Sequence, residues 1–505
     1  MKIMKKSLIS VFVCVAIVMS LYITSLLSAC SFFSSCSDPK KRVNVSTIEE
    51  MMAVNNNEIA VLTNDIDCDF AVISQISSPY GVDGAGHTIK NLVLNGNSLF
   101  QCKELTDITI ENVTYKAENI SGAAIVIQDT ATTNFPPEKS NYRFEIDNVH
   151  VKNSKMEVRA DNKSTYVGVF AGNCFTPNNP GGVGIKISNS TVENVTIDCY
   201  GSESEWQSSL YVGGLVGYSK GIEMNKCSVY KCDITVNANR TRECAVGGVI
   251  GYNYEYGTIT NCSYTDSYLD VDAFNYTTWV GTVKDTTKVY AGGIAGYFST
   301  AGAIDGCFAQ NAVIAASSIG EVNAGGIAGK VYGKSQDYIA HDFNTQVKES
   351  YVNECRVSTS YCDPKKTPHS IGGFVGMAGN VTFISSFACN TEIGLAMNNM
   401  NDYSNIAGFI GKSNSNIINY CATGVNEILL TNGNGQVETE IIDDFASSGT
   451  LSDCYITEPI VYGNSLNAEI ITETTWYTPA TIIDKLNLIS IYWEFETGKL
   501  PYFVW

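Results

Sequence analysis

Three aspartates near the start of the chain have the type and spacing of a cation site. Asp65, Asp67 and Asp69 lie in the segment EIAVLTNDIDCDF, where polar and apolar residues alternate. In a β-strand alternate side chains share a face, so the three carboxylates would lie together and Phe70 would point to the other face. Clustered oxygen atoms are the ligands that Ca²⁺ prefers. The pattern predicts either a Ca²⁺ site or, more commonly, an outer strand face that meets only solvent.

Four aromatic residues lie near one another in the sequence and could bind a ligand: Tyr254, Tyr256, Tyr276 and Trp279. They fall in or beside long segments between repeats that are rich in Thr, Asn and Asp. An aromatic ring can stack on the face of a sugar while polar neighbours bind its hydroxyls. Such rings can equally cover a corner of the fold. Glycan binding and simple packing both stay open.

Catalytic chemistry finds little support in the residue spacing. The four histidines are His87, His150, His341 and His369, and none forms the His-Glu-x-x-His pattern of a zinc peptidase. A glycoside hydrolase needs two carboxylates across a cleft. Acidic candidates for such a pair or for a lyase are Asp65, Asp67, Asp69, Glu438, Glu440, Asp443 and Asp444, with Arg240 and Arg242 as basic partners. Nothing singles them out, so we expect no catalysis and keep a polysaccharide lyase or glycoside hydrolase as the alternative.

A repeated glycine string organises the rest of the chain. Seven copies of a seven-residue string begin at Tyr166, Tyr211, Ala245, Tyr290, Asn323, Ser370 and Asn405, as in YVGGLVG. Their last glycines are 45, 34, 45, 33, 47 and 35 residues apart, which is typical of a solenoid whose coils pack on their neighbours. Paired glycines mark close backbone approach. We therefore assign a structural role to Gly213, Gly214, Gly217, Gly247, Gly248, Gly251, Gly292, Gly293, Gly296, Gly325, Gly326, Gly329, Gly372, Gly373, Gly376, Gly408 and Gly411.

A second string, Ile-x-Asn-(Cys/Val)-x-(Val/Ile/Tyr), alternates with the first, as in IENVTY at Ile110 and ITNCSY at Ile259. The step from Ile to Cys breaks the strand period of two, so the chain must bend at the Asn. Asn tolerates the left-handed conformation of a tight bend, and stacked Asn side chains can bond from coil to coil. With the Gly string as the third side, the pattern predicts an all-β fold, a right-handed three-sided parallel β-helix.

The chain has 17 cysteines, and many of them recur at one position of the second string. These are Cys227, Cys262, Cys307, Cys421 and Cys454, while we expect Leu92, Val113, Val149 and Phe387 at the equivalent position of other coils. A residue interchangeable with Val, Leu and Phe behaves as a small hydrophobe. We expect a buried column of free thiols, with some disulfides between coils as the alternative, because an oxidising compartment would permit them.

The N-terminus resembles a bacterial lipoprotein signal. Lysines in Met1–Lys6 precede an uncharged apolar run, and Leu27-Ser28-Ala29-Cys30 looks like a lipobox that would make Cys30 the lipidated residue. An uncleaved membrane helix is the alternative. Both arrangements leave everything after Cys30 outside the cytoplasm.

Four segments follow from these boundaries. We expect a signal peptide over residues 1–29, a tether over 30–43, the β-helix with an N-terminal cap over 44–469, and a C-terminal cap over 470–505. The box Ser46-Thr47-Ile48-Glu49 predicts a short helix at the N-terminal end of the array. The aromatic tail WEFETGKLPYFVW supplies bulk to close the other end.

A family resemblance rests on the same strings. Gly214-Leu215-Val216-Gly217 resembles the GLUG motif, named for Gly-Leu-any-Gly, of bacterial surface β-solenoids, and Leu62–Leu94 and Trp493–Trp505 are similar to the ends of such proteins. The resemblance implies a cell-envelope or secreted protein, in a family that includes adhesin-like chains and IgA-specific metallopeptidases. Its motifs are structural, so it implies no catalytic residue.

The functional expectation combines the repeat, the signal and the charge. A formal net charge of −19 argues against a nucleic-acid partner, which needs clustered Lys and Arg. We expect a monomeric β-solenoid, lipid-anchored to the bacterial cell envelope, that acts as an adhesin or a scaffold for a host or bacterial glycan or protein. No cofactor is expected beyond Ca²⁺ at the aspartates. A structural display stalk is a further alternative.

Overall fold

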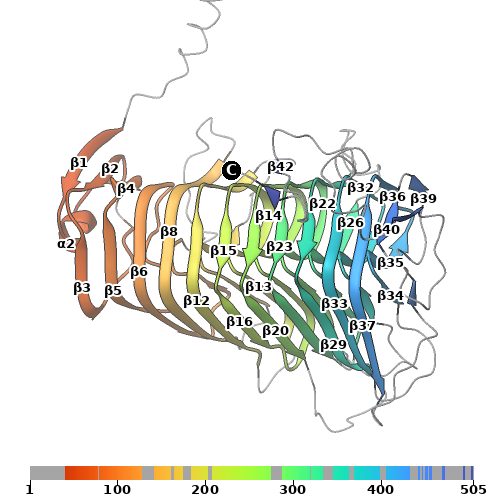
Figure 1. Cartoon of the computed structure of the whole chain (residues 1–505). Helices are drawn as coiled ribbons and strands as arrows, with labels where there is room; N and C mark the ends of the chain where they lie inside the picture. Colours follow the sequence, from red (N-terminus) through yellow and green to blue (C-terminus); the bar gives the residue numbers. More distant parts are fainter. Residues whose placement is uncertain are drawn as a thin grey trace, which may run out of the picture.

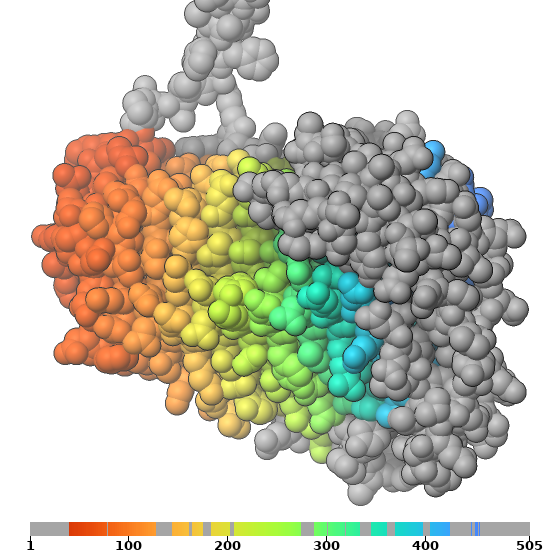
Figure 2. Space-filling model, viewed as in Figure 1, coloured from red at the N-terminus to blue at the C-terminus, as the bar shows by residue number. Residues whose placement is uncertain are grey.

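The computed structural model describes residues 40–471, except 78, 128–141, 161–163, 175–182, 203–206, 274–286, 319, 334–344, 363–368, 398–404, 433–441, 444–445, 447–449, 453 and 458–468, together with 493–494 and 502–503. The described chain is all-β apart from the five-residue helix α2 (Ile48–Met52). Apart from one antiparallel pair near the C-terminus, its strands pair in parallel and follow one another along one axis, from β1 (Lys41–Val45) at one end toward β39 (Thr450–Ser452) at the other (Figure 1). The space-filling view shows the same order on the surface (Figure 2).

One sheet contains nine strands, most of which end at the first glycine of a Gly string. The strands are β7 (Gly122–Ala123), β9 (Ser164–Gly168), β13 (Gln207–Gly213), β17 (Thr241–Gly247), β21 (Lys288–Gly292), β25 (Val322–Gly325), β30 (Ser370–Gly372), β34 (Asn405–Ala407) and β38 (Ile442–Asp443). Tyr211 pairs with Ala245, and Ala245 with Tyr290. Since equivalent string positions pair, the glycine spacings are the coil lengths, as the repeat predicted.

The second sheet contains 32 strands and takes up the chain after each Gly string. Its strands after the glycines are β10 (Ala171–Cys174), β14 (Val216–Asn225), β18 (Ile250–Thr260), β22 (Ala295–Asp305), β26 (Ala328–Gly333), β31 (Val375–Gly379) and β35 (Ile410–Asn414). Four more complete this side after an insertion or a break: β11 (Val183–Ser188), β27 (Thr345–Lys348), β32 (Val381–Ile384) and β36 (Ile417–Asn419).

The rest of each coil follows the Asn bends. These strands are β12 (Thr191–Tyr200), β15 (Ser228–Tyr230), β16 (Asp233–Asn237), β19 (Ser263–Thr265), β20 (Tyr268–Ala273), β23 (Phe308–Gln310), β24 (Val313–Ser318), β28 (Tyr351–Asn353), β29 (Arg356–Cys362), β33 (Phe387–Met397), β37 (Ala422–Asn432), β40 (Tyr455–Thr457) and β41 (Glu469–Ile471). Inward side chains of all coils form one continuous apolar core.

The first coils are less regular. They contain β2 (Glu58–Leu62), β3 (Ile66–Val72), β4 (Gly81–Asp83), β5 (Thr88–Asn95), β6 (Glu104–Glu118) and β8 (Tyr142–Arg159).

The N-cap of helix α2 is Thr47, one residue later than Ser46 at the start of the predicted capping box. Thr47 accepts a hydrogen bond from the Glu50 amide at 3.2 Å. The Glu50 carboxylate in turn accepts from the Ser46 amide at 2.6 Å. Ile48 and Met51 are buried. Near the C-terminus, β42 (Trp493–Glu494) and β43 (Tyr502–Phe503) pair antiparallel.

The Gly strings are corners, whereas the sequence predicted that they form a side of the coil. Strand β13 ends at Gly213 and β14 begins at Val216, so the chain bends at Gly214 and Leu215. A Cβ atom on Gly214 would lie 2.0 Å from the carbonyl oxygen of Gly248 in the next coil. Neither glycine has a left-handed φ, so these positions require glycine because backbones of stacked corners nearly touch.

The Asn bends adopt the predicted left-handed conformation. Asn91 and Asn112 have φ of 57° and 56°. Asn112 donates to the side-chain oxygen of Asn91 at 2.6 Å, and Asn91 donates to Asp67 at 2.8 Å. Side-chain hydrogen bonds therefore run from coil to coil, as predicted for stacked Asn. Other bends place non-Asn residues such as Lys226 and Tyr420 at positive φ, a conformation that costs such residues more.

Small buried residues that directly follow one series of these bends form a column through the stack. The strand residues that directly follow the column members pair with one another from coil to coil, which places the members themselves in line. The column runs through Val149, Ser190, Cys227, Cys262, Cys307, Ser350, Ser386, Cys421 and Cys454. Phe387 was expected here, but it pairs one position later with Tyr351. Leu92 and Val113, which pair with each other, were also misplaced, because their bends belong to a parallel second column that contains Ser154 and Cys232.

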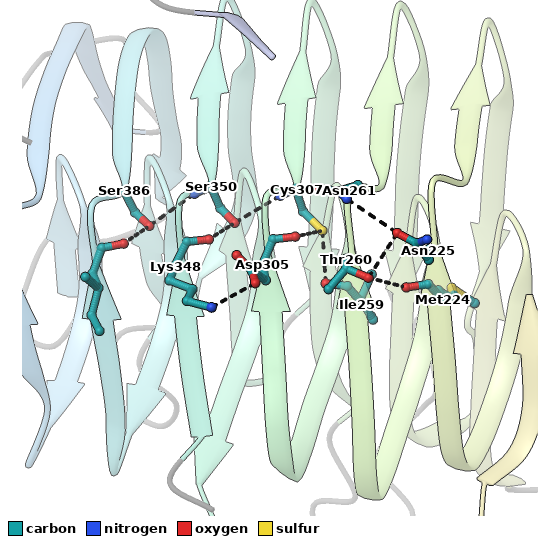
Figure 3. Close-up of polar contacts among 11 residues, drawn as sticks. Met224, Asn225, Ile259, Thr260, Asn261, Asp305, Cys307, Lys348, Ser350 and Ser386 are labelled. Carbon is teal, nitrogen blue, oxygen red and sulfur yellow. Dashed lines mark hydrogen bonds and ion pairs between the residues drawn. The ribbon is translucent and has the colours of Figure 1, made fainter. Parts of the chain in front are cut away.

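The residues of this column are small, and they also form hydrogen bonds with the backbone. Ser350 donates to the Lys348 carbonyl at 2.8 Å and accepts from the Cys307 amide at 3.1 Å, and Ser386 accepts from the Ser350 amide at 3.3 Å (Figure 3). The Cys307 thiol takes the same place, with contacts to the carbonyls of Asp305 and Ile259 at 3.4 and 3.3 Å. Cysteine is thus a weak hydrogen-bonding substitute for serine, and not only the small hydrophobe that the sequence indicated.

The cysteines whose side chains the structure describes, which exclude Cys362, are free thiols, as expected. All of these except the partly exposed Cys68 are buried. Burial raises the pKa of Cys232 and of Cys355 to about 12 and holds the pKa of Cys262 and Cys421 well above its usual range. A thiol with a raised pKa carries almost no thiolate at neutral pH and is a poor nucleophile. These cysteines are therefore structural.

Replacing Gly214 by alanine should destabilise the stack, because even one Cβ overlaps the Gly248 carbonyl. We expect a loss of about 1–3 kcal/mol in unfolding free energy. Gly394→Ala is the matched control, since its nearest contact would be 3.3 Å from Ser358 in a strand. Urea denaturation of both variants measures the difference, and equal midpoints would contradict the packed-corner interpretation.

Replacing Ser350 by alanine should leave the Cys307 amide and the Lys348 carbonyl without their side-chain partner. The expected cost is about 1–2 kcal/mol. Ser350→Cys should recover most of it, because cysteine occupies this position in neighbouring coils. Thermal unfolding of the two variants tests the polar role of the column, and an S350C protein as unstable as S350A would refute it.

Candidate functional site

Six tyrosines form a continuous cluster along the Gly corners, and we name it the tyrosine ladder. Three precede the corners, Tyr166 on β9, Tyr211 on β13 and Tyr290 on β21, and three follow them, Tyr218 on β14, Tyr252 on β18 and Tyr297 on β22. Tyr211 and Tyr290 are nearly buried, and the other four rings are partly exposed. The ladder is the largest partly exposed aromatic cluster in the described part of the chain.

The Gly corner itself brings the two rows of rings together. Tyr211 lies two residues before Gly213, and Tyr218 directly follows Gly217. A Cβ on Gly217 would lie 2.5 Å from the Val167 amide nitrogen of the preceding coil. Because no side chain separates the strands at this corner, the rings on either side of it meet, and the Tyr211 and Tyr218 centroids are 5.7 Å apart.

Coil-to-coil register then extends the contact along the axis. Tyr166 stacks on Tyr218 at 5.1 Å, and Tyr252 stacks on Tyr297 at 4.6 Å with nearly parallel planes. Tyr211 meets Tyr252 edge to face at 4.9 Å. Stacked and edge-to-face pairs at such distances contribute about 0.5–1.5 kcal/mol each beyond the area they bury. The ladder is therefore a rigid surface.

Glu243 on β17 supplies a carboxylate within the ladder. The Tyr211 hydroxyl donates to Glu243 Oε1 at 2.5 Å. Burial raises the pKa of Tyr211, Tyr252 and Tyr290, and the charge of Glu243 raises it further, as the second cause for Tyr211 and Tyr290 and after Tyr297 for Tyr252. The phenols are thus protonated at neutral pH and are hydrogen-bond donors. Although Lys288 is the register partner of Glu243, no ion pair joins Glu243 to a Lys, Arg or His in the described structure.

Lys330 closes the C-terminal end of the ladder. It takes the position of Tyr297 in the next coil, and its Nζ lies 4.7 Å from the Tyr297 ring centroid and 5.1 Å from that of Tyr290. A cation over a ring face at this distance is attracted to the π-electrons. Desolvation by burial lowers the pKa of Lys330, while Glu321 and Glu243 oppose that shift.

Both rows continue beyond Lys330 with polar or flexible side chains. Met377 and Lys412 follow Lys330, while Asn323, Ser370 and Asn405 follow Tyr290. Asn323 is buried and donates to Glu321 at 2.9 Å, and its side-chain oxygen has no partner among the described residues. The surface along the corners therefore changes from aromatic to polar toward the C-terminus.

The aromatic residues predicted from sequence meet this surface only at its edge. Tyr254 contacts the Tyr252 ring at 6.2 Å, and Tyr256 lies farther along β18, opposite Gly221 and Ala301. Tyr276 and Trp279 lie outside the described residues. The ladder residues themselves were missed, although a sequence signal existed: tyrosine opens or directly follows the Gly strings in YVGGLVGY and YAGGIAGY.

The three aspartates do not converge as a cation site would require. Asp65 accepts from the Thr88 amide at 2.9 Å, and Asp67 accepts from Asn91 and from the Asp69 amide at 3.1 Å. These hydrogen bonds lower the pKa of both carboxyls. Asp69 and Phe70 have φ of 48° and 58° and interrupt the strand with a bulge, so the predicted alternation is wrong and Phe70 is 57% exposed.

Those residues considered for catalysis that the structure describes do not form a metal site. In the described ranges no group of three His, Cys, Asp or Glu side chains is arranged to hold a metal. His87 contacts Asp65, and His150 contacts Thr191. Glu438, Glu440, Asp444 and His341 lie outside the described residues, as does Cys30. Among the described helices none is long and apolar enough to cross a membrane.

Comparison with known proteins supports the family resemblance. Residues 243–267 match the GLUG motif, and this segment contains one Gly corner and three residues with positive φ, Glu255, Asn261 and Asp266. No curated protein matches the chain. Among solved structures the chain is similar to "a new PL6 alginate lyase complex with trisaccharide", at 11% identity and a TM-score of 0.26, over 93% of this chain and 92% of that one. A likeness this low supports no inference about activity.

The buried His369 should make stability depend on pH. Its Nε2 lies 3.2 Å from the Gly320 carbonyl and its Nδ1 3.2 Å from the Thr359 hydroxyl, and burial lowers its pKa to about 4. The unfolded chain takes up a proton near pH 6.5, so the stability from neutral His369 is complete above that pH and is lost as pH falls toward 4.

We expect wild-type unfolding free energy to fall by up to about 1.4 kcal/mol per pH unit in this window. His369→Gln should lose that part of the slope, and His87→Gln, at a partly exposed position, should retain it. Urea denaturation between pH 7 and pH 4 measures the slopes. An H369Q protein with the wild-type slope would contradict the assignment.

Proposed function

We propose that this chain is a binding scaffold on the outside of a bacterial cell, held to the envelope by a lipid on Cys30 and acting as an adhesin without catalysis. The observation that carries the proposal is the tyrosine ladder, a rigid surface of partly exposed rings beside a carboxylate and an ammonium. Packing alone would be satisfied by aliphatic residues, whereas aromatic rings with polar tips are enriched where proteins bind other molecules.

The proposed architecture is a right-handed, three-sided parallel β-helix with a cap at each end. Three observations support it: strands before the Gly corner, after the Gly corner and after the Asn bend recur in successive coils. The buried face of α2 supports an N-terminal cap within segment 44–469. The aromatic strands β42 and β43 support a C-terminal cap over 470–505.

The proposed ligand is a surface glycan or protein. A net charge of −19 disfavours nucleic acid. Stacked rings with protonated phenols offer flat apolar faces together with hydrogen-bond donors, the combination that suits a sugar ring. The scaffold is proposed to act as a monomer, because each coil buries its apolar face against its neighbours within one chain.

Binding of the purified full chain to an array of glycans and matrix proteins tests the proposal. We expect Tyr218→Ala combined with Tyr252→Ala to reduce binding of the ligand about tenfold or more, because these rings supply the partly exposed surface. Tyr230→Ala is the matched control, since this partly buried tyrosine lies on β15, away from the corners. Silence on the whole array together with cleavage of a polysaccharide would overturn the proposal.

A further inference from the structure

We propose that the tyrosine ladder binds a linear polysaccharide that carries free amino groups, with a sugar ammonium paired to Glu243. This inference rests on the proposed function and specifies its ligand. It depends on the charges within the ladder and on the coil spacing.

Glu243 is the first argument, because it is a carboxylate among aromatic rings without an ion-pair partner in the described structure. Its contact is the Tyr211 hydroxyl at 2.5 Å, which fixes the orientation of the carboxylate. Tyr252 and Tyr297, whose rings stack at 4.6 Å, are raised in pKa by burial and then by neighbouring charges that include Glu243. An ammonium group is the ligand that gains both from a carboxylate and from ring faces.

Lys330 provides an internal example of the same recognition. Its ammonium lies over Tyr290 and Tyr297, so ring faces of this ladder already hold an amine. Beside Tyr211 and Tyr252 the ladder has both ring faces and a carboxylate, because Glu243 accepts from the Tyr211 hydroxyl and its charge acts on Tyr252. No ion pair in the described structure holds Glu243. Lys330 thus supplies one amine to the ladder, and we propose that a ligand supplies a second amine at Glu243.

The stacking of coils favours a polymer over a single amine. In the row after the corners, Tyr218, Tyr252 and Tyr297 recur once per coil with ring centroids 5.7 and 4.6 Å apart, close to the length of one pyranose residue in an extended chain. A linear polysaccharide along the axis could therefore place successive sugars over successive rings. The net charge of −19 attracts a polycation and disfavours an acidic polysaccharide.

The test compares three oligosaccharides of equal length by calorimetry with the full chain: β-1,4-linked glucosamine, its N-acetylated form and the glucose analogue. We expect the amine form to bind most tightly and its affinity to fall with added salt. Glu243→Gln should weaken the amine form about tenfold or more and leave the N-acetylated form unchanged. Lys330→Gln should strengthen the amine form severalfold, because it removes a like charge.

The opposite signs of these two variants separate recognition from misfolding, since a damaged fold cannot raise affinity. Tyr211→Phe adds a third measurement: it keeps the ring, removes the hydroxyl that orients Glu243, and should weaken only the amine form. Equal binding of the amine and N-acetylated forms, unaffected by E243Q, would overturn this inference and leave the proposed binding surface intact. If no oligosaccharide binds, the inference fails, and the array experiment alone decides the proposed function.

Discussion

Parallel hydrogen bonding between equivalent positions of successive coils is the interaction on which the rest of this structure depends. In the coils that the Gly corners define, each strand pairs with a strand some 33 to 47 residues away, so no coil is stable alone. The pairing places like positions about 4.8 Å apart. Every side chain must therefore fit beside the equivalent side chains of the preceding and the following coil. The glycine corners are the most restrictive case, because a Cβ there would overlap the backbone of the next coil.

The ladders of like side chains are consequences of that register. Asn stacks on Asn at the left-handed bends, Ser and Cys exchange hydrogen bonds in the small-residue columns, and Tyr stacks on Tyr beside the glycine corners. The first two satisfy backbone and side-chain polar groups inside the fold. The tyrosine ladder differs, because four of its rings remain partly exposed and it includes charged groups that the backbone does not need.

The sequence predicted the repeat, the coil lengths and the left-handed bends correctly, because each depends on spacing within one chain segment. It misplaced features that depend on partners in other coils. The string YVGGLVGY was predicted to form a side of the coil, and only the approach of Gly214 to Gly248 shows why it contains a corner. Likewise Phe387 resembles a column residue in its own segment, but pairing with Tyr351 assigns that place to Ser386.

The same limitation explains the candidate site. Sequence proximity favoured Tyr254 and Tyr256, which share a strand, whereas the ladder joins tyrosines from four consecutive coils across the Gly corners. Nor could composition distinguish Glu243 from the many other acidic residues. Its significance arises only when the rings of adjacent coils surround it, since a carboxylate among aromatic rings differs energetically from one in water.

Glu243 and Lys330 also indicate that stability alone did not shape this surface. At the position of Lys330 the next coil carries Met377, and at the position of Glu243 the preceding coil carries Ser209. The fold therefore accepts uncharged residues at both positions. A half-buried ammonium, and a carboxylate without an ion pair in the described structure, both cost desolvation free energy that Met or Ser would avoid. Departures of this kind from the most stable choice concentrate at functional sites, which is the physical reason to look for the ligand at the tyrosine ladder.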